Sequence, residues 1–411
     1  MAGAIGLPGC AFQSEMPSPG WAVSFLFPGS STGTFPLKDV RNPPDVLLVT
    51  IRIGSREIGE GAAPVVVAEM SGNHDHSLKR ALAIVDAAAA AGAHALKLQT
   101  YTADTMTLEL RQGEFLIDDP ASLWCGESLY SLYEKAHTPW EWHAPIFERC
   151  RERGLLCFSS AFDESAVELL ESLEVPAYKI ASFENADLPL IRKVAATGKP
   201  VLLSIGMASI AELAETVSCA REAGCRDLVM LQCTNSYPAS PEGSDLRTIP
   251  HLRQLFDVEV GLSDHTRGIG VAVAAVALGA SVIEKHFTLS RAEGGVDAAF
   301  SLEPPELAAL VEETRRAWQA LGGVRYGRSA AEHTSALHRR SLYVAADMHA
   351  GEVFTTRNLR RIRPGLGLAP RHYELLLGKR VTCDVARGTP VSWDLVTSEG
   401  ESHSRGEGAG S

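Results

Sequence analysis

The chain has 411 residues, enough for a domain of barrel size and a smaller one, and its 45% hydrophobic and 21% charged residues are typical of soluble globular proteins. The formal net charge of −12 argues against general nucleic-acid binding, and no stretch approaches the roughly 18 uncharged apolar residues that a membrane span requires. The eight cysteines form no CxxC pair, which favours reduced thiols and a cytoplasmic location.

The chain begins with a segment, 1–45, that is rich in proline, glycine and serine and has little hydrophobic periodicity. We therefore predict that it is disordered. The next segment, 46–61, alternates between apolar and polar residues around a Gly-Ser turn. This pattern predicts a β-hairpin, which would close the bottom of the domain that follows.

From residue 64 onward, short apolar segments alternate with segments of helical periodicity. The predicted strands are 64–70, 95–100, 155–162, 177–183, 199–206, 227–234, 258–265 and 281–288. The predicted helices are 78–93, 140–154, 164–173, 187–198, 210–224, 249–256, 269–280 and 305–322. Eight strands, each followed by a helix, predict a (β/α)8 barrel that occupies 46–322 together with the hairpin. An open doubly wound sheet fits less well, because no GxGxxG motif follows the first strand.

After the barrel the composition changes. The segment 323–338 is rich in glycine, serine and histidine and is predicted to be a linker. In 339–396, short apolar stretches are broken by glycine and proline, which indicates a small, irregular β-rich domain. The tail, 397–411, is rich in glycine, serine and glutamate and is predicted to be disordered.

Two histidines, His265 and His286, lie at the ends of the seventh and eighth predicted strands. The carboxyl ends of neighbouring parallel strands lie on one side of a barrel, so we expect the two imidazoles to share one metal ion. Mn²⁺ fits this ligand set best, and Co²⁺, Zn²⁺ and Mg²⁺ are alternatives. With only two protein nitrogens as ligands, the ion would keep open positions and act as a Lewis acid.

Two lysines, Lys97 and Lys179, lie inside otherwise apolar predicted strands, where an unpaired ammonium group is costly. Serine and asparagine side chains at the neighbouring strand ends add hydrogen-bond donors. This combination favours binding of a phosphate and a carboxylate. Two alternatives stay open: a lysine forms a Schiff base with a carbonyl substrate, or it is only paired with a carboxylate such as Glu69 or Glu284.

Eight motifs, in matching order and spacing, resemble the sialic acid synthase family: AEMSGNH, ALKLQT, LLCFSSAFD, PAYKIASFE, GKPVLLSIGMA, LQCTNSYPA, GLSDHT and EKHFT. The C-terminal RRSLYVAADMHAGEVFTTRNLRRIRPGLG resembles the SAF domain of that family, which is similar to type III antifreeze protein. The resemblance covers about 46–396. Within the family, GESLYSLYEKAHTPWEW, CFSSAFD and the ending IRPGLGLAP are most similar to the pseudaminic acid synthases.

The resemblance implies a metal-dependent transferase that condenses phosphoenolpyruvate with the open-chain aldehyde of an N-acetylated amino sugar. Phosphate leaves by C–O cleavage, and the product is a nine-carbon 2-keto acid. For a pseudaminic acid synthase the sugar is 2,4-diacetamido-2,4,6-trideoxy-altropyranose. An N-acetylneuraminate or legionaminate synthase is the alternative within the family. A catalytically inactive barrel whose SAF domain binds a glycan is the alternative of another class.

The matching motifs also imply roles for single residues. The implied metal ligands are His265 and His286, and the implied catalytic residues are these two with Glu69, Lys97 and Lys179. The phosphoenolpyruvate site is implied to consist of Lys97, Ser160, Lys179, Ser182, Ser204, Asn235 and Ser263. The sugar contacts are implied to be Asn73, Tyr237 and Asp297, together with Arg363 from the SAF domain of a partner subunit. This last contact implies a domain-swapped homodimer.

Overall fold

The structure is a computed structural model that describes residues 22–24, 34–36, 50–120, 122–324 and 326–397. The chain divides into two units after Gly322. Within the segment that was predicted to be disordered, strands β1 (Ala22–Ser24) and β2 (Thr34–Pro36) pair in antiparallel fashion. The rest of 1–45 and the tail 398–411 lie outside the described residues. No helix in the described part of the chain has the length and apolarity to cross a membrane.

The first unit contains eight parallel strands that close into a barrel, which confirms the predicted fold class. Each strand pairs with the next one along the chain, and the last pairs with the first. The strands are β5 (Val65–Glu69), β6 (Ala95–Thr100), β7 (Leu156–Ala161), β8 (Tyr178–Ile180), β9 (Val201–Ser204), β10 (Leu228–Cys233), β11 (Glu259–Asp264) and β12 (Val282–His286). Their side chains are buried along almost their whole length, as expected for strands covered on both faces.

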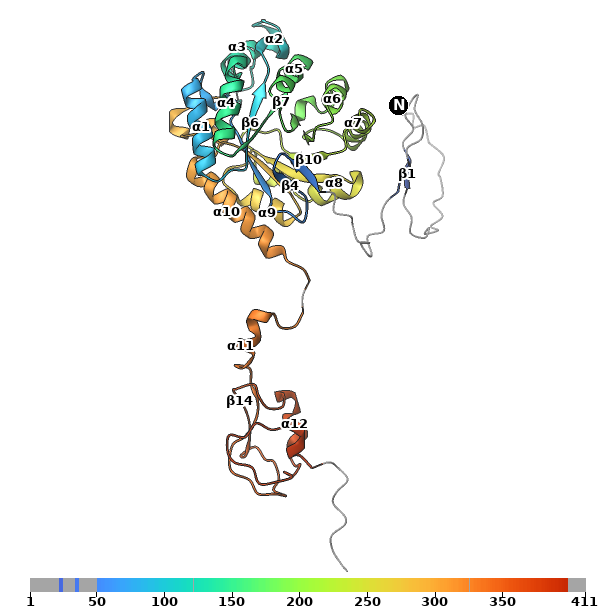
Figure 1. The fold of residues 1–411 in the computed structure, drawn as a ribbon, viewed down its shortest axis with the longest axis vertical. Helices are drawn as coiled ribbons and strands as arrows, with labels where there is room; N and C mark the ends of the chain where they lie inside the picture. Colours follow the sequence, from blue (N-terminus) through green and yellow to red (C-terminus); the bar gives the residue numbers. More distant parts are fainter. Residues whose placement is uncertain (1–21, 25–33, 37–49, 121, 325, 398–411) are drawn as a thin grey trace, which may run out of the picture. The chain divides into compact units, whose positions relative to one another are not determined.

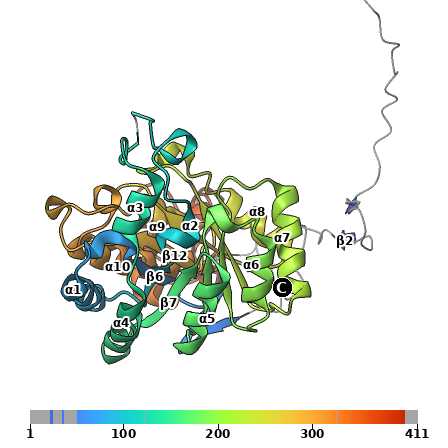
Figure 2. The ribbon, with the colours of Figure 1, turned by 90° about the horizontal axis from the view of Figure 1, so that it is seen from above.

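Helices surround this ring of strands, as Figures 1 and 2 show. They are α1 (Leu78–Ala90), α4 (Trp140–Glu152), α5 (Glu164–Ser172), α6 (Leu188–Ala195), α7 (Ile210–Glu222), α8 (Thr248–Phe256), α9 (Gly270–Ala277) and α10 (Pro304–Leu321). The long connection between β6 and α4 holds two further short helices, α2 (Ala103–Met106) and α3 (Leu129–Ala136). Several helices begin at a side chain that accepts backbone N–H groups, such as Asp163 before α5 and Ser209 before α7.

The predicted hairpin is present as β3 (Ile51–Ile53) and β4 (Arg56–Ile58), which pair in antiparallel fashion. The side chains of Ile51, Ile53 and Ile58 are buried in one apolar cluster with the side chains that the barrel strands direct into the lower interior. The amino-terminal end of the barrel is therefore closed by a packed apolar layer. The polar side chains that point into the described barrel interior lie toward the carboxyl ends of the strands.

The second unit has its own apolar core. Strands β13 (Ser341–Val344) and β14 (Leu359–Ile362) pair in antiparallel fashion, and isolated bridges join the remaining extended segments. The short helices of this unit are α11 (His333–Ala336) and α12 (Tyr373–Leu376). Thr397, the first residue of the predicted tail, donates its backbone N–H to the carbonyl oxygen of Arg380 at 2.9 Å. The ordered second unit therefore includes Thr397.

Candidate active site

A layer of polar side chains lies directly above the apolar layer in the barrel interior. Side chains alternate between two faces along a strand, so residues two apart point the same way. The apolar cluster that contains Ile51 has one barrel residue at each of seven strands after which, two positions on, the side chain is polar or a cysteine. These residues are Glu69, Lys97, Ser160, Lys179, Ser204, Cys233 and Glu284. In β11 the corresponding residue is Ser263, two positions after Gly261. All eight side chains are buried.

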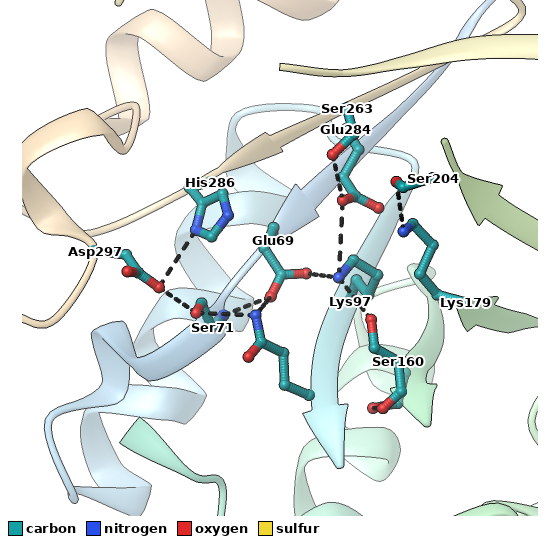
Figure 3. Close-up of polar contacts among 12 residues, drawn as sticks. Glu69, Ser71, Lys97, Ser160, Lys179, Ser204, Ser263, Glu284, His286 and Asp297 are labelled. Carbon is teal, nitrogen blue, oxygen red and sulfur yellow. Dashed lines mark hydrogen bonds and ion pairs between the residues drawn. The ribbon is translucent and has the colours of Figure 1, made fainter. Parts of the chain in front are cut away.

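Lys97 is the centre of this layer (Figure 3). Its ammonium group lies 2.5 Å from a carboxylate oxygen of Glu69 and 3.8 Å from one of Glu284, and it donates a hydrogen bond of 3.1 Å to the hydroxyl of Ser160. Ser263 donates a hydrogen bond of 2.9 Å to the same oxygen of Glu284. Burial disfavours the charged form of Lys97, but the charges of Glu284 and Glu69 outweigh burial and raise its pKa. Lys97 is thus a cation held between two carboxylates.

The two carboxylates differ in their affinity for a proton. Burial raises the pKa of Glu69, and Lys97 opposes that rise without cancelling it. Burial also acts on Glu284, but the positive charges of Lys97 and Lys179 outweigh it and lower the pKa of Glu284. Two nearby carboxylates whose pKa values move in opposite directions are typical of sites where one group transfers protons and the other stays charged. Glu69 is the proton-transfer candidate.

Lys179 has different surroundings from Lys97. It donates hydrogen bonds of 2.7 Å to the hydroxyl of Ser204 and 2.9 Å to the carbonyl oxygen of Ile180. No carboxylate in the described part of the chain lies within ion-pair distance of it. Burial therefore lowers the pKa of Lys179, and Glu284 only partly opposes this. A buried ammonium group without a counter-ion gains more from an incoming anion than a paired one does.

Ser182 and Asn235, also predicted to bind phosphoenolpyruvate, converge at Gly206. A Cβ atom at Gly206 would lie 2.4 Å from the Asn235 side-chain oxygen and 2.9 Å from the Ser182 hydroxyl, so a larger residue there would displace both side chains. The Ser182 hydroxyl and the Asn235 amide nitrogen are buried and make no hydrogen bond with the described residues. Unpartnered buried donors are costly, which indicates that this place is built for a ligand with acceptor oxygens.

The structure brings His265 and His286 together, with ring centroids 5.2 Å apart. His265 Nδ1 lies 2.9 Å from the carbonyl oxygen of Thr234, so Nδ1 carries the proton and donates it to that oxygen. The Nε2 lone pair of His265 is then available to a metal ion. The buried His286 Nδ1 finds no hydrogen-bond partner in the described part of the chain, and a carboxylate oxygen of Asp297 lies 3.6 Å from it.

These two imidazoles fit a divalent metal ion. Burial lowers the pKa of His286 well below its usual value, so His286 is neutral and keeps a lone pair. Burial disfavours a charged His265 too, but Cys233 and Thr234 outweigh burial and raise its pKa, so metal binding would weaken as the pH falls. Among the described residues, no three His, Cys, Asp or Glu side chains form a metal-binding group. That this pair binds a divalent ion through two protein ligands stays a prediction.

The residues predicted to contact the sugar lie beside the two histidines. The Tyr237 ring centroid is 4.6 Å from that of His265 and 5.4 Å from that of Phe300. Asp297 accepts a short hydrogen bond from Ser71. Asn73 donates hydrogen bonds of 3.0 Å to the carbonyl oxygen of Phe287 and 2.9 Å to Ser301. None of the residues that the structure describes donates a hydrogen bond to its buried side-chain oxygen.

Arg363 is the one predicted site residue outside the barrel. It belongs to the second unit, where it is exposed and directly follows β14. Its assignment to the active site of a partner subunit stays a prediction.

Glu184 was not among the assigned site residues. It ends the short helix η3 (Ser182–Glu184) that follows β8, and one of its carboxylate oxygens is buried without a hydrogen-bond partner among the described residues. Burial raises the pKa of Glu184 to about 7, against a smaller opposing effect of Lys179. The sequence signal that could have identified it is its place in KIASFE, two residues after a site serine.

The raised pKa of Glu184 predicts a pH dependence of stability. A carboxyl group whose folded-state pKa is raised contributes stability that is complete below its unfolded pKa, near 4.5, and is lost as the pH rises through about 7. We expect Glu184→Gln to gain about 2–3 kcal/mol of unfolding free energy relative to the wild type between pH 5 and pH 8. Urea unfolding at both pH values measures this, with the exposed Glu222→Gln as control. An equal difference at both pH values would contradict the prediction.

Two family models match the chain. The model of the NeuB family matches residues 84–326, and the model of the SAF domain matches residues 339–397. The two matches fall on the barrel and on the second unit, respectively. The second unit is therefore an SAF domain.

Named relatives cover most of the chain. A pseudaminic acid synthase of Campylobacter jejuni is 43% identical over 79% of this chain and 94% of its own length, and one of Helicobacter pylori is 42% identical over 81% and 98%. A crystal structure of an N-acetylneuraminic acid synthetase from Leptospira borgpetersenii has a TM-score of 0.63 at 31% identity and covers 70% of this chain and 95% of its own. An N,N'-diacetyllegionaminic acid synthase of Campylobacter jejuni is 33% identical over 77% and 96%.

Proposed function

The chain belongs to the NeuB family, and on that premise we propose that it condenses phosphoenolpyruvate with the open-chain aldehyde of an N-acetylated amino sugar. The observation that carries the proposal is one buried layer with two lysines beside a pair of histidines. Lys97 is paired with a carboxylate, and Lys179 is bonded to the hydroxyl of Ser204. The higher identity to the pseudaminic acid synthases favours 2,4-diacetamido-2,4,6-trideoxy-altropyranose as the sugar over the substrates of neuraminate or legionaminate synthases.

The anionic substrate is assigned to the lysine side of the layer. Phosphoenolpyruvate carries a phosphate and a carboxylate, and the described residues offer Lys179 without a counter-ion. The unpartnered donors of Ser182 and Asn235 add neutral hydrogen bonds beside it. Charge-assisted hydrogen bonds from lysine are among the strong ones in proteins, so this side of the layer can bind an anionic ligand despite the negative net charge of the chain.

The aldehyde is assigned to the histidine side. A divalent ion bound by His265 and His286, with Mn²⁺ the first choice, would supply Lewis-acid polarisation of the sugar carbonyl. The chain's own contribution there is to hold both imidazoles in one orientation, through the hydrogen bond of His265 to Thr234 and the proximity of Asp297 to His286. The rings of Tyr237 and Phe300 pack against the two imidazoles on this side.

In the proposed reaction, C3 of phosphoenolpyruvate attacks the aldehyde carbon and water adds at C2, after which the C–O bond breaks and phosphate leaves. Glu69 is positioned to accept the proton of that water, since burial raises its pKa and its carboxylate is fixed by Lys97, Gln99 and the N–H of Ser71. Glu284 stays charged and keeps Lys97 protonated. The lysines hold the reacting groups in line, which lowers the entropic part of the barrier.

The proposal includes the oligomeric state that the family resemblance implies. In a domain-swapped homodimer, Arg363 of one subunit would reach the sugar side of the other. The experiment that tests this part mixes an Arg363→Ala protein with a Glu69→Gln protein. Recovery of activity in the mixed dimers supports shared sites, and no recovery after verified subunit exchange contradicts them.

The central test follows phosphate release from phosphoenolpyruvate with Mn²⁺ and each candidate hexosamine in turn, with the product identified by mass. We expect turnover with the 2,4-diacetamido-2,4,6-trideoxy sugar and loss of turnover on addition of a chelator. Borohydride reduction in the presence of a keto acid discriminates the Schiff-base alternative, which predicts a covalent adduct on Lys97 or Lys179. An adduct, or full turnover after thorough removal of metal, would overturn the proposal.

A further inference from the structure

Trp124 lies in the connection between β6 and α4 and has no role in the site as described so far. Residues 116–120 and 122–128 of this connection pair as the two sides of a hairpin, since Leu116 bridges Ser128 and the backbone groups of Ile117 pair with Glu127 and Gly126. The half-buried Trp124 ring leaves this hairpin and contacts Tyr237, with centroids 6.1 Å apart. A loop far away in sequence thus supplies a ring to the sugar side of the site.

A hydrogen bond fixes the position of Trp124. Its indole N–H donates to the carbonyl oxygen of Val296 at 3.2 Å. Val296 immediately precedes Asp297, so Trp124 connects the two loops that carry the proposed sugar contacts Tyr237 and Asp297. Because its only polar group is already satisfied by the protein, the ring offers just an apolar surface to a ligand.

The rings of His265, Tyr237 and Trp124 follow one another in this order, and from this order we infer which part of the sugar reaches Trp124. Tyr237 contacts His265, where the aldehyde carbon is assigned, and it also contacts Trp124. The lysine side is assigned to phosphoenolpyruvate, so the carbon chain of the sugar extends from the histidines past Tyr237. The end of the sugar opposite the aldehyde, C6, then lies against Trp124.

We propose that Trp124 is a specificity-determining residue whose ring forms an apolar wall for the C6 methyl group of a 6-deoxy amino sugar. The inference rests on the proposed function and deepens it by naming the group that selects the sugar. A hydroxyl at C6 would lose water against this wall without gaining a partner there, which is unfavourable, whereas a methyl group gains from the burial. Selection of this kind at an apolar wall is worth about 10-fold to 200-fold in kcat/KM.

The test compares two substrates that differ only at C6, 2,4-diacetamido-2,4,6-trideoxyaltrose and its 6-hydroxy counterpart. We expect the wild type to prefer the deoxy sugar by at least about 10-fold in kcat/KM and Trp124→Ala to remove most of that preference. The KM for phosphoenolpyruvate should stay within about twofold, because Trp124 contacts only the sugar side. Leu123→Ala, at an exposed neighbour on the same hairpin, is the matched control and should behave as the wild type.

Trp124→Phe separates recognition from a purely structural role. Phenylalanine keeps an aromatic ring but cannot donate to Val296. If the ring forms the wall, Trp124→Phe keeps most of the preference. An equal loss in Trp124→Phe and Trp124→Ala would show that the hairpin tether alone matters and would overturn the inference, as would an unchanged preference in Trp124→Ala. If the wild type turns over neither sugar, the proposed function itself fails. If the wild type is active and its preference for the deoxy sugar is the same in the Trp124 variants, only the inference about Trp124 is refuted.

Discussion

Replacing His286 with alanine is expected to lower the rate of phosphate release roughly 1000-fold, because Lewis-acid polarisation contributes several kcal/mol and each factor of ten in rate corresponds to about 1.4 kcal/mol. The structural reason is the small number of protein ligands that the proposed metal ion would have. Of the described residues, His265 and His286 are the two imidazoles that lie together here and no group of three His, Cys, Asp or Glu side chains surrounds them, so the loss of His286 leaves the proposed ion a single imidazole ligand. Binding of Mn²⁺, measured directly by calorimetry, should be lost together with the activity.

His286 is buried, so its removal also leaves a cavity that could affect folding. His286→Gln fills most of that space without an imidazole and should show the same loss of Mn²⁺ binding with a melting temperature near that of the wild type. His251→Ala, at an exposed position on α8, controls for the loss of a histidine elsewhere and should keep full activity. If the His286 variants bind Mn²⁺ as tightly as the wild type, the two-imidazole site is wrong.

The barrel and much of its polar layer could be predicted because both follow from strand periodicity. In β12 the period of two places Glu284 and His286 on the face of Val282, which is inside the barrel, and Lys285 on the opposite face. Lys285 accordingly pairs with Asp264 at 2.8 Å, away from the interior layer. In the motif EKHFT, the alternation along β12 separates the site residues Glu284 and His286 from the structural ion pair of Lys285.

The loops could not be predicted in the same way, because no periodicity fixes how a loop returns over the barrel. Trp124 is over a hundred residues from Tyr237 in sequence, and the contact between them depends on the conformation of both loops. Glu184 illustrates a second limit. Its pKa depends on how deeply a single turn of η3 is buried, which strand patterns do not determine. The question of whether Lys97 is paired with a carboxylate also needed coordinates, and both suggested partners, Glu69 and Glu284, lie beside it.

Replacing each lysine of the layer with methionine is expected to give opposite results in stability. Lys97→Met removes the cation between Glu69 and Glu284 and leaves two buried carboxylates facing each other. Breaking a buried pair in this way costs about 3–5 kcal/mol of unfolding free energy. The loss should be greater at pH 8 than at pH 5, since protonation of Glu69, whose pKa is raised by burial, relieves the repulsion. Urea unfolding at the two pH values measures both effects.

Lys179→Met should leave the free energy of unfolding unchanged or slightly higher. Burial already disfavours the ammonium group of Lys179, and no carboxylate of the described residues is left unpaired when it is removed. Affinity for phosphoenolpyruvate should nevertheless fall by about 10-fold to 100-fold, the value of one or two hydrogen bonds to a charged group. Calorimetric titration with phosphoenolpyruvate measures this, and Lys193→Met, at a surface position on α6, is the control.

The Lys97→Met and Lys179→Met variants together test whether Lys97 stabilises the fold and Lys179 binds the substrate. Lys97 is held in place by the protein's own charges, so the fold is expected to depend on it, whereas Lys179 has no counter-ion among the described residues and is proposed to receive one from the substrate. A stability loss in Lys179→Met as large as that in Lys97→Met would mean that Lys179 is paired in the folded protein, and the anion site would then have to be placed elsewhere. Unchanged affinity for phosphoenolpyruvate in Lys179→Met would lead to the same conclusion, because the donors of Ser182 and Asn235 alone carry no charge to match the ligand.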